Sequence, residues 1–346
     1  MIKCVVWDLD NTIWEGIISE EETVKVRTEV IGIIKELNQK GIVNTICSRN
    51  DFGVIKQKLE ELHLWKLFVY PQINWSDKTV NIRNFIQKFH FKIEDIAFVD
   101  DNPFERELVK KNLGEISVVD GNDIKSIQNI LGNIDENVSF FEAQNRVQLY
   151  KIEERRIRDN ESFQGTDLEF LKECNITVTI RRAKQLDLER ISGLIERTNQ
   201  LNTMGKFYDK NKVVDLIQKE NYDVLVANVF DKYGEYGDAG LLIAENRGAS
   251  YKIELLVVSC RLLGKGLPQT LLAYSHRRAI MNKCSQLECD FTKTKYNRQM
   301  RILFAMNGMQ VEPSTDSRCK YTMKCDKRNI EYPAWIHFIE KSDMTK

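Results

Sequence analysis

Apolar residues in the first 135 positions follow two patterns. Mainly apolar runs without a helical period occupy residues 2–7, 42–47, 67–69 and 96–99, and such runs are typical of strands buried on both faces of a parallel sheet. Between them, apolar residues recur at helical spacing over 30–37, 52–62 and 82–89, and a further strand and helix are expected within 116–131. Strands and helices that alternate in this way predict an α/β domain with a parallel sheet.

The second half of the chain has longer strand patterns. Strands are expected at 176–180, 222–229, 239–245, 251–259 and 287–291, and helices at 188–195, 267–282 and 298–307. A glycine-containing turn joins the second and third of these strands, which predicts antiparallel pairing. The charged residues 140–160 are typical of a linker helix. We therefore expect an α/β domain at 1–138, a linker helix at 139–160 and an α+β domain at 161–346.

Composition and charge narrow the class of protein. The chain has 346 residues, with 51 Lys and Arg against 51 Asp and Glu, so charge gives no reason to expect nucleic acid or an acidic membrane as partner. No apolar run approaches the length that spans a bilayer and no signal-peptide pattern opens the chain, so a cytoplasmic protein is expected. The eight cysteines include no Cys-x-x-Cys pair, and most are expected to be buried or free thiols.

Carboxylates follow two of the predicted strands in the first domain. Asp8 and Asp10 come after the first run, and Asp100 and Asp101 come after the run at 96–99. The carboxyl ends of parallel strands lie at one edge of a sheet. Adjacent carboxylates there would repel each other unless a cation neutralised them, so this pattern indicates a divalent metal site.

Donor groups occupy two further positions of the same kind. Ser48, Arg49 and Asn50 follow the strand at 42–47, where a phosphate oxygen could be held. Lys78 opens a predicted helix, where a cation is disfavoured by the helix dipole and so suggests an anionic partner. Two simpler interpretations stay open, which are a polar turn that caps a helix and a solvated surface lysine.

The ordered set Asp8-x-Asp10, Ser48, Lys78 and Asp100-Asp101 resembles the four motifs of the haloacid dehalogenase (HAD) phosphatase superfamily over about residues 1–135. The resemblance implies that Asp8 is the nucleophile which forms an aspartyl-phosphate, and that Asp10 protonates the leaving group and activates water. It implies Ser48 and Lys78 as ligands of the phosphoryl oxygens. It also implies Mg²⁺ bound by Asp8, the Asp10 carbonyl and one or both of Asp100 and Asp101.

The spacing of these motifs bears on access to the site. Thirty-seven residues separate Asp10 from Ser48 and twenty-one separate Lys78 from Asp100, and a helix and a strand use most of each interval. Neither interval can hold a folded cap domain. We therefore expect a HAD-like Rossmannoid domain without a large cap, and an open pocket that favours a large substrate such as a group tethered to a protein.

The segment Arg261-x-x-Gly264-x-Gly266 lies between a long predicted strand and a helix. It resembles the pyrophosphate loop of the GNAT acyltransferase fold, where N–H groups at a helix N-terminus receive the phosphates of coenzyme A. Asn297 leads the last predicted helix, which is similar to the same fold. The resemblance implies a GNAT-like α+β domain in which these residues bind substrate, although a glycine pair before a helix also has purely conformational uses.

Cys260 is the candidate nucleophile of the second domain. It lies where a strand meets a helix N-terminus, beside Arg261 and near Lys265, and positive potential there favours a thiolate. The alternative is a buried structural cysteine, which describes most cysteines.

The two halves together are similar to the FkbH-like family, on the stretches 7–16, 99–106 and 259–266. That resemblance implies transfer of a glyceryl unit from 1,3-bisphosphoglycerate to the phosphopantetheine thiol of an acyl carrier protein in polyketide or tetronate pathways. The sequence departs from the family at Arg49, where Lys is usual, and at Ile13, where Leu is usual. Two other functions stay open, a stand-alone phosphatase of small phosphoesters and a CoA-dependent N-acetyltransferase with an inactive first domain.

Overall fold

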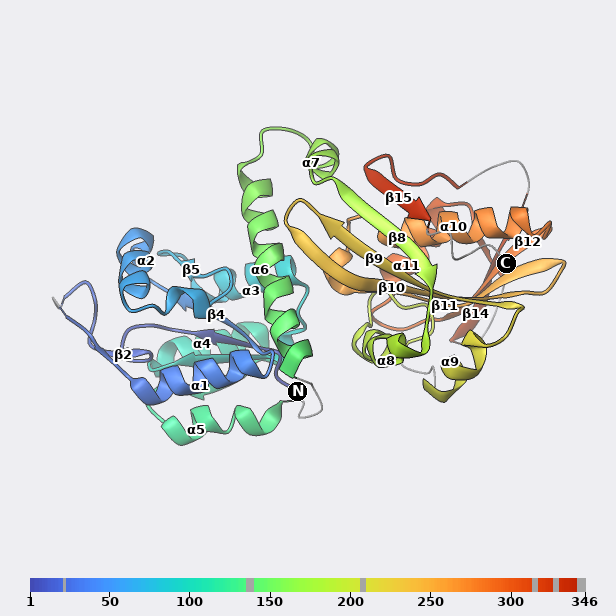
Figure 1. The fold of residues 1–346 in the computed structure, drawn as a ribbon. Coiled ribbons are helices and arrows are strands. Elements are labelled where there is room, and N and C mark those ends of the chain that lie inside the picture. The colour runs from blue at the N-terminus through green and yellow to red at the C-terminus, as the bar shows by residue number, and fades with distance from the viewer. Residues whose placement is uncertain (21–22, 135–139, 206–209, 313–316, 326–329, 341–346) are drawn as a thin grey trace. The chain divides into compact units, whose positions relative to one another are not determined.

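The chain forms two compact units, Met1–Ser162 and Phe163–Lys346 (Figure 1). The structure is a computed structural model that describes residues 1–346 except 21–22, 135–139, 206–209, 313–316, 326–329 and 341–346. An α/β unit with a parallel sheet comes first and an α+β unit comes second. The predicted fold class is thereby confirmed.

The first unit is built on a sheet of five parallel strands. Their order is β5, β4, β1, β6, β7, and their bounds are Gln72–Ile73, Val43–Ser48, Cys4–Trp7, Ile96–Asp100 and Ser117–Asp120. β1 is central, and its residues alternate between two cores, with Val5 and Trp7 in one and Cys4 and Val6 in the other. The apolar run therefore reflects burial of both faces.

Helices cover the two faces of this sheet. Buried residues of α1 (Thr28–Gln39), α2 (Phe52–Glu61) and α5 (Ile124–Gln128) contribute to one core. Those of α3 (Lys78–Phe89) and α4 (Pro103–Leu113) contribute to the other. Asp51, Asp77 and Asn102 cap the starts of α2, α3 and α4 by accepting backbone N–H bonds. These caps fix where each helix begins.

One strand of the sequence analysis is wrong. Leu67 ends a 3-10 helix, η1 (Trp65–Leu67), Phe68 and Val69 follow it, and the edge strand is β5 instead. Phe68 and Val69 are buried, and the Val69 N–H donates to the Asn44 carbonyl at 2.8 Å. Their apolar character therefore reflects the burial of a connecting segment and not a paired strand.

The connection from β1 to α1 spans residues 8–27. Among its described residues it adds one small antiparallel hairpin, β2 (Trp14–Glu15) with β3 (Lys25–Val26). The described residues between α3 and β6 add only the 3-10 helix η2 (Ile93–Asp95). These described connections contain no cap domain, in agreement with the spacing argument.

The helix expected as a linker belongs to the first unit. α6 (Phe140–Ser162) lies against α1 and α3, and Figure 1 shows it along one side of that unit. Near its end, Glu161 accepts a hydrogen bond from the Tyr70 hydroxyl at 2.6 Å. Residue 139, where the linker was expected to begin, lies outside the described residues.

The second unit contains an eight-stranded sheet in the order β13, β14, β12, β11, β10, β9, β8, β15. Only the β11–β12 and β8–β15 pairs are parallel. In chain order the strands from β8 are Ile176–Arg182, Tyr222–Asp231, Gly234–Asn246, Ser250–Val258, Gln286–Thr292, Gln310–Val311, Arg318–Lys324 and Ile336–Glu340. The antiparallel turn predicted between 222–229 and 239–245 is confirmed as the β9–β10 hairpin.

Helices pack on both faces of this sheet as well. α8 (Leu188–Arg197) and α9 (Lys210–Ile217) share a core with alternate residues of β9, β10 and β11. α10 (Leu267–Met281) packs on the opposite face, where a Cβ on Gly240 would lie 3.1 Å from Leu271 Cδ1. The remaining helices are α7 (Asp167–Glu173) and α11 (Arg298–Met306). The sequence analysis missed α7, α9, β13, β14 and β15 of this unit.

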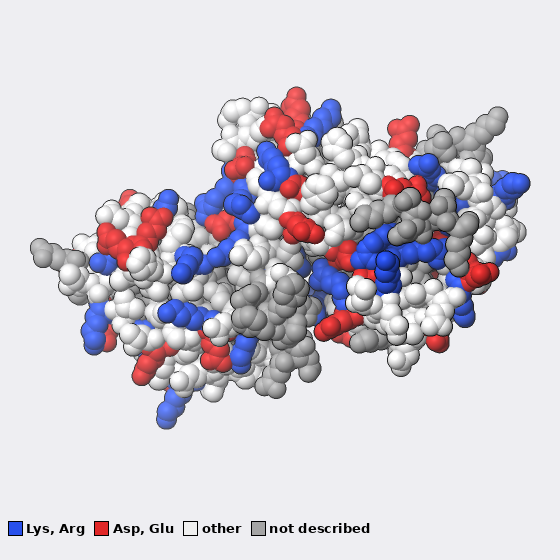
Figure 2. Space-filling model, in the orientation of Figure 1, with Lys and Arg blue, Asp and Glu red and all other residues white. Residues whose placement is uncertain are grey.

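Surface charge is mixed, as equal numbers of acidic and basic residues would give. On the face drawn in Figure 2, blue and red side chains are interspersed over most of the described surface. None of the described helices combines the length and apolar character that a membrane crossing requires.

A substitution at Gly41 tests how closely α6 packs on the rest of the first unit. Its φ is +75°, and a Cβ there would lie 2.8 Å from Ala143 Cα in α6. We expect Gly41→Ala to lower the free energy of unfolding by about 2–4 kcal/mol, because left-handed strain and overpacking against α6 add. Urea denaturation followed by circular dichroism measures the change.

Gly114→Ala is the matched control for this variant. Gly114 also has a positive φ, +60°, but a Cβ there meets nothing within 4 Å. It should lose only about 1–2 kcal/mol from backbone strain. Equal losses in the two variants would show that the approach of α6 to Gly41 contributes nothing.

Candidate active site

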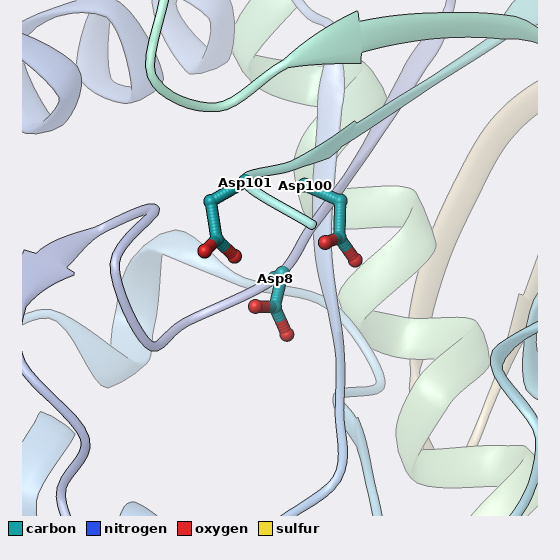
Figure 3. A group of neighbouring side chains, drawn as sticks. All are labelled: Asp8, Asp100 and Asp101. Carbon is teal, nitrogen blue, oxygen red and sulfur yellow. The ribbon is translucent and has the colours of Figure 1, made fainter. Parts of the chain in front are cut away.

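Three carboxylates converge at the carboxyl edge of the parallel sheet (Figure 3). Asp8 follows β1, Asp100 ends β6 and Asp101 comes next. One oxygen from each lies within 4.8 Å of the others. Asp8 and Asp100 are buried, and Asp101 is half-buried. The parallel pairing of Trp7 with Val99 brings these residues together, although they are far apart in the sequence.

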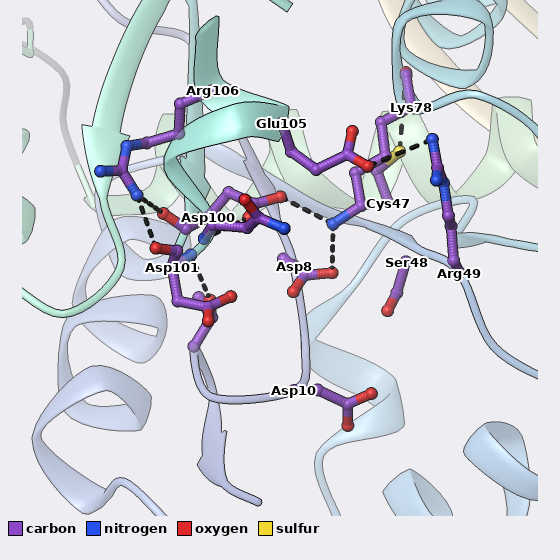
Figure 4. A network of polar contacts seen from close by, with 12 residues as sticks. Asp8, Asp10, Cys47, Ser48, Arg49, Lys78, Asp100, Asp101, Glu105 and Arg106 are labelled. Atoms are coloured by element: carbon purple, nitrogen blue, oxygen red, sulfur yellow. Dashed lines mark hydrogen bonds and ion pairs between the residues drawn. The ribbon is translucent and has the colours of Figure 1, made fainter. Parts of the chain in front are cut away.

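Lys78 places an ammonium group between two of these carboxylates (Figure 4). Its Nζ lies 2.8 Å from Asp8 Oδ1 and 2.6 Å from Asp100 Oδ2, and its side chain is only 6% exposed. Lys78 is the first residue of α3, which begins directly after the Asp77 cap. The alternative of a solvated surface lysine is therefore wrong.

The pKa values of Asp8, Lys78 and Asp101 are all raised. Burial raises the pKa of Asp8 to about 7, Lys78 opposes that rise, and the neighbouring Asp100 adds to it. Burial would lower the pKa of Lys78, but Asp8 and Asp100 outweigh that effect and raise it. Burial and Asp100 also raise the pKa of Asp101. A further positive charge beside Asp8 and Asp101 would therefore favour their ionised forms.

The three carboxylates are suitable ligands for a hard divalent cation. Carboxylate oxygens are the ligands that Mg²⁺ prefers, usually together with water and substrate phosphate. Lys78 is the one cation within ion-pair distance of the Asp8 and Asp100 carboxylates in the described part of the chain. Three carboxylates with a single ammonium leave negative charge for a divalent ion to balance, so Asp8, Asp100 and Asp101 are the residues that would hold Mg²⁺.

The Asp10 side chain lies apart from the three-carboxylate group. Asp10 Oδ1 accepts hydrogen bonds from Trp14 Nε1 at 2.8 Å and from the Ile18 N–H at 3.2 Å, and Oδ2 accepts one from Asn50 Nδ2 at 2.9 Å. These bonds fix the orientation of the carboxylate. Asp10 is therefore a separate carboxylate with a fixed orientation, outside the three-carboxylate group.

Ser48, the last residue of β4, and the two residues that follow it all make polar contacts at this edge of the sheet. Ser48 is buried and lies 3.2 Å from Asn50 Nδ2, which also donates to Asp10. Arg49 Nη2 lies 3.1 Å from Glu105 Oε1, and the Arg49 side chain stays 41% exposed. Asn50, expected to bind substrate, instead holds Asp10 in this structure.

Glu105 is a site residue that the sequence analysis missed. It lies in the first turn of α4 and is buried, with Arg49 on one carboxylate oxygen. The other oxygen, Oε2, has no hydrogen-bond partner among the described residues. An Asp-Asn-Pro-x-Glu pattern gives a helix start but does not reveal that its Glu will meet a loop from another strand.

Four further residues that the sequence analysis did not select hold the site loops. Thr12 Oγ1 accepts from the Asp101 N–H at 3.1 Å. Arg106 Nη1 donates to the Asp100 and Asp101 carbonyls, each at 2.8 Å. Arg27 Nη1 donates to the Thr12 and Gly121 carbonyls. A Cβ on Gly121 would lie 2.8 Å from Thr12 Oγ1, so only glycine fits there.

The predicted residues of the second unit lie around the start of α10. Cys260 and Arg261 belong to a 3-10 turn, η5 (Cys260–Leu262), after β11. The Cys260 thiol is partly exposed. Gly264 and Gly266 both have positive φ, +74° and +92°. The two glycines are thus required by the turn itself.

Asn297 does not fit the predicted contact with substrate. It is completely buried, its Nδ2 donates to the Asn202 and Thr292 carbonyls at 3.1 and 2.9 Å, and its Oδ1 accepts from the Thr294 N–H. Its side-chain polar atoms are therefore used within the fold. Asn297 joins two segments of the second unit, and the sequence position before a helix could not reveal this.

Comparisons with known proteins find likeness in structure only. No family model matches the chain, and no curated protein matches it. One solved structure is the N-terminal part of a Bacteroides fragilis protein containing a phosphatase domain, complexed with Mg. It is 28% identical, with a TM-score of 0.36, over 39% of this chain. This chain spans only 41% of that chain.

Two acetyltransferases are also similar in structure. PaiA N-acetyltransferase from Thermoplasma acidophilum, complexed with coenzyme A, is 15% identical over 42% of this chain and 98% of its own, with a TM-score of 0.35. Spermidine N-acetyltransferase from Vibrio cholerae, complexed with CoA and spermine, is 13% identical over 42% of this chain and 95% of its own, with a TM-score of 0.32. TM-scores this low do not identify an activity for this chain.

Metal binding can be tested on unfolding. A cation that binds only the folded state stabilises it, by about 2.7 kcal/mol at one hundred times the dissociation constant. We expect millimolar Mg²⁺ to raise the thermal unfolding midpoint of the wild-type protein. Asp101→Asn should weaken that effect at least tenfold in Mg²⁺ concentration.

Asp51→Asn is the matched control for metal binding. It changes a carboxylate of the same edge into another good helix cap, outside the three-carboxylate group. It should keep the wild-type response to Mg²⁺. A wild-type midpoint that Mg²⁺ does not move would contradict the assigned metal site.

Proposed function

We propose that the first unit is a Mg²⁺-dependent phosphatase of the HAD type, and that the chain as a whole transfers a glyceryl unit from 1,3-bisphosphoglycerate to an acyl carrier protein. One observation supports the phosphatase part above all, namely the convergence of Asp8, Asp100 and Asp101 around Lys78. The glyceryl part rests on the resemblance to the FkbH-like family.

Asp8 and Asp10 have complementary roles in the proposed reaction. A carboxylate oxygen of Asp8 attacks phosphorus, the bond from phosphorus to the substrate oxygen breaks, and Asp10 gives that oxygen a proton. Water then attacks phosphorus, Asp10 takes a proton from it, and phosphate leaves with Asp8 restored. Trp14 and Asn50, which hydrogen-bond the Asp10 carboxylate, keep it directed during both proton transfers.

Lys78 and a bound Mg²⁺ would stabilise the negative charge of the phosphoryl oxygens. Lys78 lies against Asp8 and would donate to a phosphoryl oxygen. Mg²⁺, when bound, would supply further positive charge to these oxygens. Ser48 is the last residue of β4, and its buried hydroxyl would donate a third contact.

The chemistry of the acyl phosphate constrains which site performs which of the two reactions. If Asp8 attacked the acyl phosphate of 1,3-bisphosphoglycerate, the product would be a free carboxylate and the activation needed for a thioester would be lost. Attack by a thiol on the acyl carbon breaks the bond to phosphate and keeps that activation. We therefore propose that Cys260, or the carrier thiol directly, takes the acyl group, and that the Asp8 site removes the 3-phosphate.

Asp8→Asn tests this division of labour. The variant keeps the shape of the side chain but loses the nucleophile, so 3-phosphoglyceryl should accumulate on the enzyme or carrier. Intact-protein mass spectrometry after incubation with 1,3-bisphosphoglycerate, Mg²⁺ and phosphopantetheinylated carrier reads the mass of each species. Free glyceryl-carrier from this variant would refute the division. A wild-type enzyme that only hydrolyses free phosphoesters would favour the stand-alone phosphatase.

Cys260→Ala tests the route of the acyl group. If the acyl group passes through Cys260, the carrier should be loaded at least a hundredfold more slowly, because a covalent step is lost. Cys325→Ala is the control, since Cys325 is also a partly exposed cysteine of the second unit that forms no disulfide. Loading that is unchanged in Cys260→Ala would show direct transfer to the carrier thiol.

A further inference from the structure

Exposed apolar side chains of the first unit gather at the edge of the sheet that carries the acids. Among the side chains that the structure describes in this unit, Met1 is the one large apolar side chain that is exposed elsewhere. The others are Phe52, Val54, Trp75, Val80 and Phe104, which we call the apolar rim. Exposed apolar residues scattered singly are normal, but a group of them at one place on the surface indicates a binding function.

The apolar rim borders the acids because three helices begin at this edge. α2, α3 and α4 follow β4, β5 and β6, and each helix carries its residues of the apolar rim in its first turn. Lys78, the first residue of α3, touches Asp8 and Asp100. Arg49, before α2, lies 3.1 Å from Glu105 of α4. These two sets of contacts join the three helix starts at the candidate site.

Trp75 is the most exposed residue of the apolar rim, at 73%, and it lies on a fixed turn. The Ser76 N–H donates to Asn74 Oδ1 at 2.9 Å, and Asn81 Nδ2 of α3 donates to the same oxygen at 3.0 Å. The Asn74 N–H donates to the Ser48 carbonyl at 3.2 Å. The turn is thus tied to both α3 and β4, so a ligand that covers the ring has little backbone to immobilise.

Charge beside the apolar rim identifies what would lie on it. The buried ammonium of Lys78, together with a cation held by the three acids, suits a phosphate group. A phosphate ester bound there has its organic part outside the charged centre, next to the apolar rim. Free 3-phosphoglycerate ends in a carboxylate and has little apolar surface to bury. A pantetheine thioester instead offers a long chain of methylene, methyl and amide groups.

We propose that the apolar rim binds the organic chain that carries the phosphate, so that the first unit selects a phosphoester on a long tether over a free one. The identity of the tether, the pantetheine arm of a carrier, rests on the proposed function. Its methyl and methylene groups would be buried against Trp75 and Phe104. Covered in this way, the site would exclude water without a cap among the described connections.

Phosphate release from two substrates tests this selection. The substrates are 3-phosphoglyceryl-pantetheine thioester and free 3-phosphoglycerate, each given to the full chain with Mg²⁺. We expect kcat/KM of the wild type to be at least a hundredfold higher for the thioester. Trp75→Ala should reduce this preference to less than tenfold, mainly by raising KM for the thioester, because the ring contributes to binding and not to the chemical step.

Two further variants are controls for Trp75→Ala. Leu186→Ala removes an exposed apolar side chain of the second unit, 81% exposed, and should keep the wild-type preference. Trp75→Phe retains an aromatic ring on the turn and should keep the preference within about threefold of the wild type. General damage to the phosphatase site would lower both rates and leave their ratio unchanged.

The outcomes separate this inference from the proposed function. A wild type that hydrolyses both esters equally well would overturn the inference and leave the phosphatase in place. A wild type that hydrolyses neither would overturn the proposed function, and the inference with it. An unchanged preference in Trp75→Ala would refute the role of the apolar rim. A loss seen only with a phosphoglyceryl-loaded carrier, and not with the pantetheine thioester, would show that the apolar rim contacts the carrier protein instead of the arm.

Discussion

A single buried ammonium group between two buried carboxylates governs the arrangement of the first unit. Lys78 lies within 2.8 Å of Asp8 and within 2.6 Å of Asp100. Charges buried in this way are tolerated only when each finds its partner at close range, and removing one partner leaves a costly unpaired charge. The end of β1, the end of β6 and the start of α3 must therefore keep their relative positions. The unit thereby also keeps Asp8, Asp100 and Asp101 close enough together to share a divalent cation.

The residues around this centre serve mainly to keep its loops in place. Arg106 and Thr12 bind backbone groups of the Asp100–Asp101 turn, and Arg27 ties the loop after β1 to Gly121. Backbone contacts of this kind orient the carboxylates without consuming their oxygens. Asn50 does the opposite for Asp10, because it binds the carboxylate itself. The site thus separates three acids suited to a cation from one acid suited to proton transfer.

In the second unit, β11 and β12 pair only over Ser250–Ile253 and Gln286–Cys289, and another segment of the chain bonds to the strands beyond that point. Its own residues 201–203 satisfy the backbone groups that β11 and Thr292 would otherwise leave open, and buried backbone groups require such partners. Before α10, Pro333 packs against Gly266 so closely that a Cβ there would lie 3.0 Å from Pro333 Cγ.

The sequence by itself determined the strands with two buried faces, the helix starts and the set of carboxylates at one sheet edge, because these depend on local periodicity and on the direction of parallel strands. It could not determine that residues 67–69 are a buried connection, that Glu105 meets Arg49, or that Asn297 is enclosed by the Asn202 segment. Those outcomes depend on which distant segments pack together. A polar or apolar residue type is compatible with several partners, and only tertiary packing decides which partner it has.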